Sequence, residues 1–385
     1  MPSETPWDLV LVGGGLQNSL VALAVLAERP DTRLLLLERG PGLGGNHIWC
    51  FHAGDVSPEA RGFVDPLVVR RWRGYDVFFP HRERRLDESY AAVTSSRLDQ
   101  VVRARLEAAP RAKLSTLADV TAVGRDFVRL SDGTEHRARL VVDARGPEGL
   151  PLHGVVGYQK FLGLELRLRR PATRDCPVVM DARVPQTDGF RFFYWLPFEP
   201  DRVLLEDTYF SDGPELDLPQ LRQGILDYAR GAGLEVSEVE REERGVLPLP
   251  TRHVPVPRAE SPLIAGYQGG WFHPTTGYSF PMALRLAEVV SRAPPDQVFG
   301  KDWTQLVARH RAGLRYALLL NRMLFGAFRP EDRYHVLERF YGLPVATIRR
   351  FYALTLTGTD RARILVGRPP RGFSWRQALA SRILQ

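Results

Sequence analysis

The chain has 385 residues, 44% of them hydrophobic and 25% charged, which is the balance of a folded protein rather than a disordered one. This length can hold two domains, or one domain with a large insertion. The net charge of +7 comes mostly from scattered arginines, and no basic run accompanies a recognised nucleic-acid motif, so nucleic acid is excluded as a partner. No apolar stretch approaches the roughly 20 residues of a membrane span.

The two cysteines, Cys50 and Cys176, show neither CxxC spacing nor a nearby histidine cluster. We therefore expect reduced thiols, no metal site and a cytoplasmic protein. The polar N-terminus, which enters an apolar run almost at once, does not have the form of a signal peptide.

A dinucleotide-binding pattern opens the chain. Residues 8–15 read DLVLVGGG, residues 16–29 continue with helical apolar spacing, and residues 33–38 read RLLLLE. Strand, glycine turn, helix, strand and acidic end follow one another as in a Rossmann-like βαβ unit.

Each part of this pattern has a chemical use. Gly13 allows a tight turn, Gly15 lets the backbone approach a pyrophosphate, and Leu16 begins a helix whose free N–H groups attract phosphate. Glu38 can accept hydrogen bonds from ribose hydroxyls. Asn18 replaces the third glycine of the usual pattern, so the helix must pack on its strand with a larger residue there.

Two later glycine-containing segments are weaker candidates for cofactor contact. The loop at 40–52 brings Gly45, Asn46 and His47 near the nucleotide, although His47 packed on Trp49 is an equally good interpretation.

The strand at 138–146 ends in Asp143 and Gly146, which favours a second backbone approach to the cofactor, or a plain strand–turn. Gly277, just before a helix in the segment 261–292, again fits backbone lying close to a ligand.

Between residues 72 and 96 we expect a strand, a charged hairpin-like turn RERRLDE and a second strand, followed by a helix at 96–110. Residues 155–250 are rich in β-forming and aromatic residues, and we expect an inserted substrate domain there. The acidic and basic run at 235–250 is most simply a solvated strand.

One strand of this region, VLLEDTYF at 203–210, carries adjacent carboxylates at Glu206 and Asp207. Alternation places them on opposite faces, so one must enter the core or a cavity. A buried carboxylate is costly unless it is partnered, and an ion pair with an arginine is the structural alternative to a catalytic role.

From about residue 295 the chain is helical, basic and aromatic. This region is either a helical cap on the fold or a membrane-docking face, since arginine with Phe, Tyr and Leu suits an interfacial surface.

Several strings together resemble the bacterial lycopene β-cyclases of carotenoid biosynthesis. They extend from the first strand to about residue 370 and include VGGGLQNSL, GGNHIWCFH, VDARG, LLEDT, GWFHPTTGYSFP and ERFYGLP.

The resemblance implies an α/β fold of the flavin monooxygenase type: a Rossmann-like FAD-binding domain with an inserted antiparallel β-sheet substrate domain and C-terminal helices. We expect the FAD-binding domain at 1–75, 96–150 and 255–295, the substrate domain at 76–95 and 151–254, and a helical, membrane-associating region at 296–385.

The resemblance also implies the reaction. Such enzymes convert the acyclic ends of lycopene to β-ionone rings, giving γ-carotene and then β-carotene, with reduced FAD as a non-redox cofactor and NAD(P)H as the electron donor. They associate peripherally with the inner membrane on its cytoplasmic side. A flavin monooxygenase or reductase acting on a polyprenoid is the alternative.

By position, the family's acidic motif matches Glu206, which we expect to be the acid/base residue, with Asp207 as second choice. Gly13, Gly15 and Glu38 match its nucleotide site, and His273–Ser279, with Thr276, Gly277 and Tyr278, its second flavin segment. Gly266–Tyr267 replaces the Gly-Asp pair usual in the broader monooxygenase class. Phe192, Tyr194, Trp195 and Phe272 are candidates to line a polyene tunnel.

Overall fold

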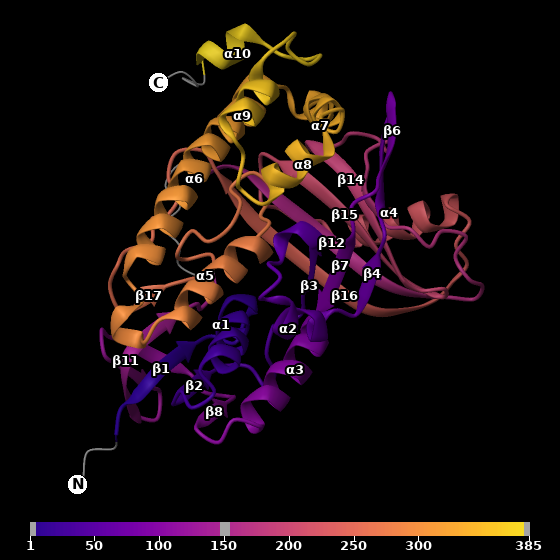
Figure 1. Cartoon of the computed structure of the whole chain (residues 1–385). Coiled ribbons are helices and arrows are strands. Elements are labelled where there is room, and N and C mark those ends of the chain that lie inside the picture. Colours follow the sequence, from indigo (N-terminus) through magenta and orange to yellow (C-terminus); the bar gives the residue numbers. More distant parts are fainter. Residues whose placement is uncertain (1–4, 147–154, 381–385) are drawn as a thin grey trace.

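A computed structural model describes residues 5–146 and 155–380 of the chain. In this part of the chain the strands form two seven-stranded sheets and one three-stranded sheet, with helices packed around them (Figure 1). The expected domain boundary at 150/151 lies outside the described residues.

The first sheet contains the glycine turn. Its core is parallel: β1 pairs with both β2 and β11, β2 pairs with β8, and β11 pairs with the short β17. Antiparallel β9 and β10 complete it. The strands are β1 (Trp7–Val12), β2 (Leu34–Leu37), β8 (Ala112–Ser115), β9 (Val120–Val123), β10 (Phe127–Leu130), β11 (Glu135–Asp143) and β17 (Leu263–Ile264).

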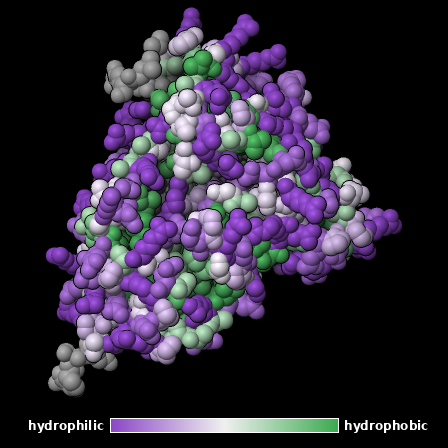
Figure 2. All heavy atoms as spheres, viewed as in Figure 1, coloured by the Kyte–Doolittle hydropathy of each residue, from purple (hydrophilic) through white to green (hydrophobic). Residues whose placement is uncertain are grey.

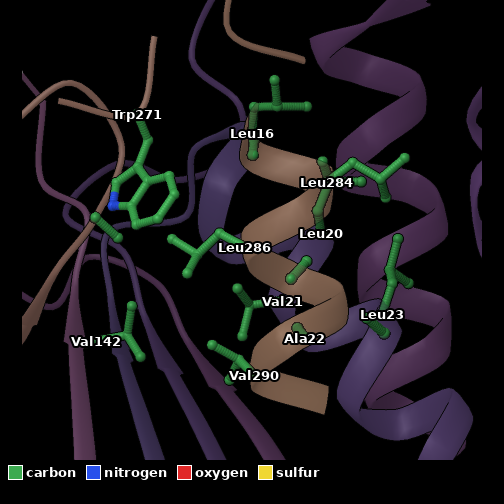
Figure 3. Packing of buried hydrophobic residues seen from close by; sticks show 14 of the residues in the cluster. Leu16, Leu20, Val21, Ala22, Leu23, Val142, Trp271, Leu284, Leu286 and Val290 are labelled. Carbon is green, nitrogen blue, oxygen red and sulfur yellow. The ribbon is translucent and has the colours of Figure 1, made fainter. Parts of the chain in front are cut away.

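Helices α1 (Leu16–Glu28) and α5 (Phe280–Arg292) pack side by side against this sheet, with α3 (Ser95–Glu107) beside α1. Figure 3 shows Leu20 and Val21 of α1 against Leu286 of α5. Apolar residues on nearly every turn explain why α1 is buried along most of its length. The side chain of Gln17 donates to the carbonyl of Ala283 at 3.0 Å, so the two helices begin at the same end.

The second sheet is mostly antiparallel and has the order β16-β12-β15-β14-β13-β5-β6. One face packs on α4 (Leu218–Gly231), and the other packs on the three-stranded sheet and the C-terminal helices. Its strands are β5 (Tyr75–Phe79), β6 (Arg82–Leu86), β12 (Val155–Leu168), β13 (Val178–Asp181), β14 (Phe190–Glu199), β15 (Arg202–Ser211) and β16 (Val236–Pro250).

The small sheet joins the two halves. It contains β3 (Ile48–His52), β4 (Arg70–Trp72) and β7 (Tyr90–Thr94), with β7 in the middle, and α2 (Arg61–Val64) lies nearby.

The expectation of a charged turn in RERRLDE was wrong. Arg82–Leu86 is strand β6, which pairs with β5, whereas β7 pairs with β3 and β4 in the small sheet. Charged side chains suit β6 because it is an edge strand that is largely exposed. The strand Tyr90–Thr94, expected in the substrate domain, therefore lies outside the large antiparallel sheet.

The helical C-terminal region is confirmed. It contains α6 (Lys301–Ala327), α7 (Tyr334–Phe340), α8 (Val345–Tyr352), α9 (Gly358–Leu365) and α10 (Trp375–Ala380). Helix α6 runs from beside α5 to α10, at the far end of the molecule (Figure 1). Among the described helices, none is long and apolar enough to cross a bilayer.

Candidate functional site

The glycine turn after β1 is shaped for close backbone approach. Gly13 has φ +91°, and a Cβ there would lie 2.9 Å from the carbonyl oxygen of Ala144, so only glycine fits. Gly15 is different, because a Cβ on it would meet no protein atom within 4 Å. No side chain caps the helix that begins at Leu16, so its first N–H groups remain available to an anion.

Asn18 explains how the turn works without its third glycine. The side chain is fully buried, and its amide donates to the carbonyls of Val12 at 2.9 Å and Gly13 at 3.0 Å. The larger residue thus fills the space between helix and strand and satisfies two carbonyls.

Glu38 lies at the end of β2, beside this turn. Its carboxylate accepts the backbone N–H groups of Gly14 and Gly40, both at 2.6 Å. A carboxylate has about four acceptor positions, so it retains capacity for ribose hydroxyls.

The segment His273–Ser279 is a tight turn that leads into α5. The N–H of His273 donates to the carbonyl of Tyr278 at 2.7 Å, and the ring of His273 accepts the N–H of Thr275. Thr276 orders the turn as well, since its hydroxyl accepts the N–H of Tyr278. The Tyr278 hydroxyl donates to the buried carboxylate of Asp55 at 2.5 Å. This bond ties the turn to the segment that directly follows β3 of the small sheet.

Gly277 stands at the centre of this turn with φ +65°. A Cβ there would lie 2.9 Å from Leu247 and 3.1 Å from the side-chain oxygen of Gln159. That oxygen is buried and, among the described residues, has no hydrogen-bond partner, so it can accept a bond from a ligand group. The open space at Gly15, the two adjacent helix starts and this unpartnered oxygen together fit a phosphate-linked dinucleotide.

The loop with Gly45, Asn46 and His47 joins the glycine turn to the second sheet. Gly44 donates its N–H to the carbonyl of Gly14, and Asn46 donates to the carbonyl of Glu242 on β16. The ring centroid of His47 lies 5.8 Å from that of Trp49, and burial lowers the pKa of His47. Asn46 and His47 border a hollow of about 440 Å³ with β16 residues.

At the end of β11, Asp143 forms an ion pair with Arg145. Its carboxylate forms two hydrogen bonds to Arg145, at 3.0 and 2.7 Å, and its side chain is buried. Gly146 accepts a hydrogen bond from Gln268 at its carbonyl. Asp143 pairs in register with Val12, so this strand end does lie next to the glycine turn.

The two carboxylates of β15 point to opposite faces, as alternation predicts. Asp207 faces α4, where Arg191 donates to it at 2.9 and 2.7 Å and Tyr209 donates at 3.2 Å. Burial raises the pKa of Asp207, and the Arg191 guanidinium opposes this rise. The ion pair expected as an alternative is therefore present at Asp207.

Glu206 lies on the inner face and, among the described residues, has no cation within ion-pair distance. Its carboxylate accepts one hydrogen bond, from the hydroxyl of Thr208 at 2.7 Å. Burial raises the pKa of Glu206 to about 8, and the negative charge of Glu243 adds to this rise. Such a carboxyl is largely protonated at neutral pH.

Glu243 on β16 was missed by the sequence interpretation. The run EREERG looks like a solvated strand, but Glu243 is only 4% exposed, and burial raises its pKa to about 7. Period-2 alternation in this strand does place Arg241, Glu243 and Gly245 on one face, which is the signal that could have found it.

Aromatic side chains gather on the same face as Glu206. Tyr194 pairs in register with Glu206, and its ring lies 5.2 Å from that of Phe192. The buried ring of His52 lies 5.1 Å from that of Tyr90, in a cluster that includes Tyr75, Tyr278 and Tyr352. Two expected tunnel residues lie elsewhere: Trp195 packs on the α4 face and Phe272 stacks on Tyr267 in the core around α1.

Comparison with solved structures identifies the fold. The chain superposes on p-nitrophenol 4-monooxygenase from Pseudomonas putida with a TM-score of 0.66 at 14% identity, over 91% of this chain and 99% of that one. A probable FAD-dependent monooxygenase, PqsL from Pseudomonas aeruginosa, gives a TM-score of 0.61 at 16% identity, over 88% and 99%. The expected fold class is confirmed.

Sequence comparison is more specific. Curated proteins named lycopene beta-cyclase are 41% identical to this chain, over 97% of both chains in Pseudescherichia vulneris, and over 94% of this chain and 95% of the relative in Pantoea ananas. The family model described as lycopene cyclase protein matches residues 8–378. With nearly the whole chain covered by both comparisons, this protein belongs to the lycopene cyclase family.

Proposed function

We propose that this protein is a lycopene β-cyclase, which converts lycopene to γ-carotene and then to β-carotene. The observation that carries the proposal is Glu206: a partly buried carboxyl that, among the described residues, has no ion-pair partner, is protonated near neutral pH, and lies on a face lined with aromatic rings. The names of the 41% identical relatives support the choice of substrate and product.

Cyclisation needs a proton given and a proton taken back. The carboxyl of Glu206 donates its proton to the terminal alkene, which leaves a Glu206 carboxylate and a tertiary carbocation. The cation adds to the neighbouring double bond and closes the ring. The carboxylate then removes a ring proton, so the product has the mass of the substrate and Glu206 is again protonated.

Tyr194 and Phe192 present ring faces and edges where positive charge develops, and they exclude the water that would trap a cation. On this assignment Asp207 is a structural residue, because its bonds to Arg191 hold it on the opposite face.

We assign FAD to the glycine-turn site, with Gly13, Gly15 and Leu16 at the pyrophosphate and Glu38 at the ribose. Gly45, Asn46, His47, Asp143, Gly146, Thr276, Gly277 and Tyr278 are the other residues that we assign to this site. Reduced flavin, when bound, supplies negative charge that stabilises a nearby cation. NAD(P)H is the proposed electron donor, although only one dinucleotide fingerprint is present in the sequence.

We also propose that the protein works in the cytoplasm, bound peripherally to the inner membrane. Apolar side chains are exposed at the end of α9 and in α10: Val366 is 69% and Trp375 66% exposed. The arginines at 363, 368, 371 and 376, close to them in the sequence, are exposed as well. Figure 2 shows a mostly hydrophilic face with small hydrophobic areas, some of them over α7–α10. This combination suits an anionic lipid surface.

The overall reaction is tested by anaerobic incubation with lycopene in liposomes and chemically reduced FAD, without NAD(P)H. We expect a cyclic product of unchanged mass, because the flavin is not consumed, as read by chromatography and mass spectrometry. A product that appears only after aeration, with a mass increased by oxygen, would instead identify a monooxygenase.

Glu206→Gln removes the proton donor but preserves side-chain size, so we expect cyclase turnover to fall at least about 100-fold. FAD binding and the free energy of unfolding should hardly change. Asp207→Asn is the matched control: it leaves Arg191 without its anion and should lower the free energy of unfolding by roughly 3 kcal/mol. Equal turnover in wild type and Glu206→Gln would rule out Glu206 as the acid.

Gly15→Val tests the nucleotide site. The added side chain meets no protein atom near its Cβ and Gly15 has φ −70°, so the fold should tolerate it. The same side chain occupies the space assigned to pyrophosphate, and we expect FAD affinity to fall at least about tenfold. Gly62→Val, equally free of contacts, is the control and should bind FAD as wild type does in fluorescence titrations.

Membrane docking is tested by flotation with liposomes that contain anionic lipid. The double variant Val366→Glu/Trp375→Glu should float less than wild type, since it places charge on the docking face. Leu117→Glu, an exposed apolar position beyond β8, should float like wild type. If wild-type protein stays at the bottom of the gradient at both low and high salt, the docking proposal fails.

A further inference from the structure

Gly163 lies between Glu206, which is partly buried, and Glu243, which is buried. Strand β12 is flanked by β15 and β16, and Gly163 pairs in register with Glu206 on one side and with Glu243 on the other. Residues directly opposite in antiparallel strands project to the same face. Both carboxyls therefore rise from the inner face of the sheet, on either side of a residue without a side chain.

The space over Gly163 is filled by the side chains of Glu243, Leu204 and Glu206. A Cβ placed on Gly163 would lie 3.1 Å from Cγ of Glu243 and 3.6 Å from Cβ of Glu206. Any larger residue would stand between the glutamates and separate them. Glycine at this position allows their negative charges to interact through a region that is buried and poorly screened.

The two carboxyls differ in their partners. Arg241 donates to Glu243 at 2.9 Å, and the N–H of Ile48 also donates to this carboxylate. Arg241 is itself held by Glu165 at 2.9 Å. These contacts stabilise the ionised form of Glu243, whereas Glu206 accepts one hydrogen bond within the described part of the chain, from the hydroxyl of Thr208.

The structure assigns a function to this pair: we propose that Glu243, whose ionised form Arg241 stabilises, is a positioning residue that keeps the proton on Glu206. The inference rests on the proposed role of Glu206 as the acid. Glu243 takes no part in the proton transfer itself: the proton leaves Glu206 for the alkene and returns to Glu206 from the ring. Repulsion between the two carboxylates makes the ionised Glu206 a stronger base, which favours that return.

Other groups that face Glu206 do not replace this effect. From β3, Cys50 interacts with both glutamates, and from β14 Tyr194 interacts with Glu206; burial keeps both of these groups neutral by raising the pKa of each. Arg241 lowers the pKa of Glu206, and Asp207 on the opposite face raises it. Glu243 is the largest charged influence on Glu206, after burial itself.

Infrared difference spectroscopy of the full-length protein tests the pair without any need for catalysis. The band of a buried protonated carboxyl is followed with pH, and Glu206 is identified by its loss in Glu206→Gln. We expect the midpoint to lie above pH 7 in wild type. In Glu243→Gln it should move at least about one pH unit lower, because the repelling charge is gone.

Glu165→Gln is the matched control, since it also releases a partner of Arg241 but keeps Glu243. It should shift the midpoint much less, and Glu243→Asp should restore most of the wild-type value. In cyclase assays with pre-reduced flavin, the loss of activity at alkaline pH should move in the same direction in Glu243→Gln.

An unchanged midpoint in Glu243→Gln overturns the proposal, and so does an equal shift in Glu165→Gln. If wild type shows no cyclase activity, the proposed function fails, but the infrared titration still decides whether the two carboxyls interact. A titration that behaves as expected, in a protein that cyclises lycopene without Glu206, would leave the pair intact and remove only its catalytic role.

Discussion

The register of β12 with its two neighbours is the constraint on which the chemistry depends. It places Glu206 and Glu243 over Gly163 on the inner face, and it places Asp207 over α4 on the outer face. Because side chains alternate with a period of two, a shift of β15 by one residue would exchange the two carboxylates of that strand. The long ladders between β12 and its partners therefore determine which acid lies on the inner face.

The carboxyls on the two faces of this sheet are stabilised in different ways. On the outer face, Asp207 is neutralised by Arg191 and the network packs beneath α4, so the charge adds to the integrity of the domain. On the inner face, Glu206 is left without such a cation. That arrangement costs stability, because a carboxyl without an ion-pair partner in such a site either stays protonated or, when it ionises, loses hydration that no partner replaces. In the mechanism that we propose, this protonated carboxyl is the acid that starts cyclisation.

A short stretch of chain at residues 44–52 links the glycine turn to the second sheet. The loop at Gly44 is hydrogen-bonded to the glycine turn, and Asn46 both donates to β16 and accepts from Arg241 at 2.6 Å. Strand β3 follows. Its Ile48 donates to Glu243, and His52 at its end packs against Tyr90. The same segment thus contacts both the glycine turn and the strand that carries Glu243, and it fixes their positions relative to each other.

Local sequence determined a good part of this protein. Three features depend on residues that are close in the sequence, so the sequence suffices to predict them: the glycine turn, the acidic end of β2, and the alternation at Glu206 and Asp207. The resemblance in longer strings added the family and the fold. The charged strand β6, by contrast, was mistaken for a turn, since nothing local reveals that it lies at a sheet edge.

Only the tertiary structure decided which carboxylate is free. Arg191 reaches Asp207 from the neighbouring strand, and Glu243 lies 37 residues beyond Glu206 in a run that looks solvated. Whether such residues meet depends on strand order and register, which are set by the packing of whole sheets. A sequence pattern predicts which face of the sheet a side chain lies on. The neighbour on that face comes from another strand, and this neighbour determines whether the side chain is charged.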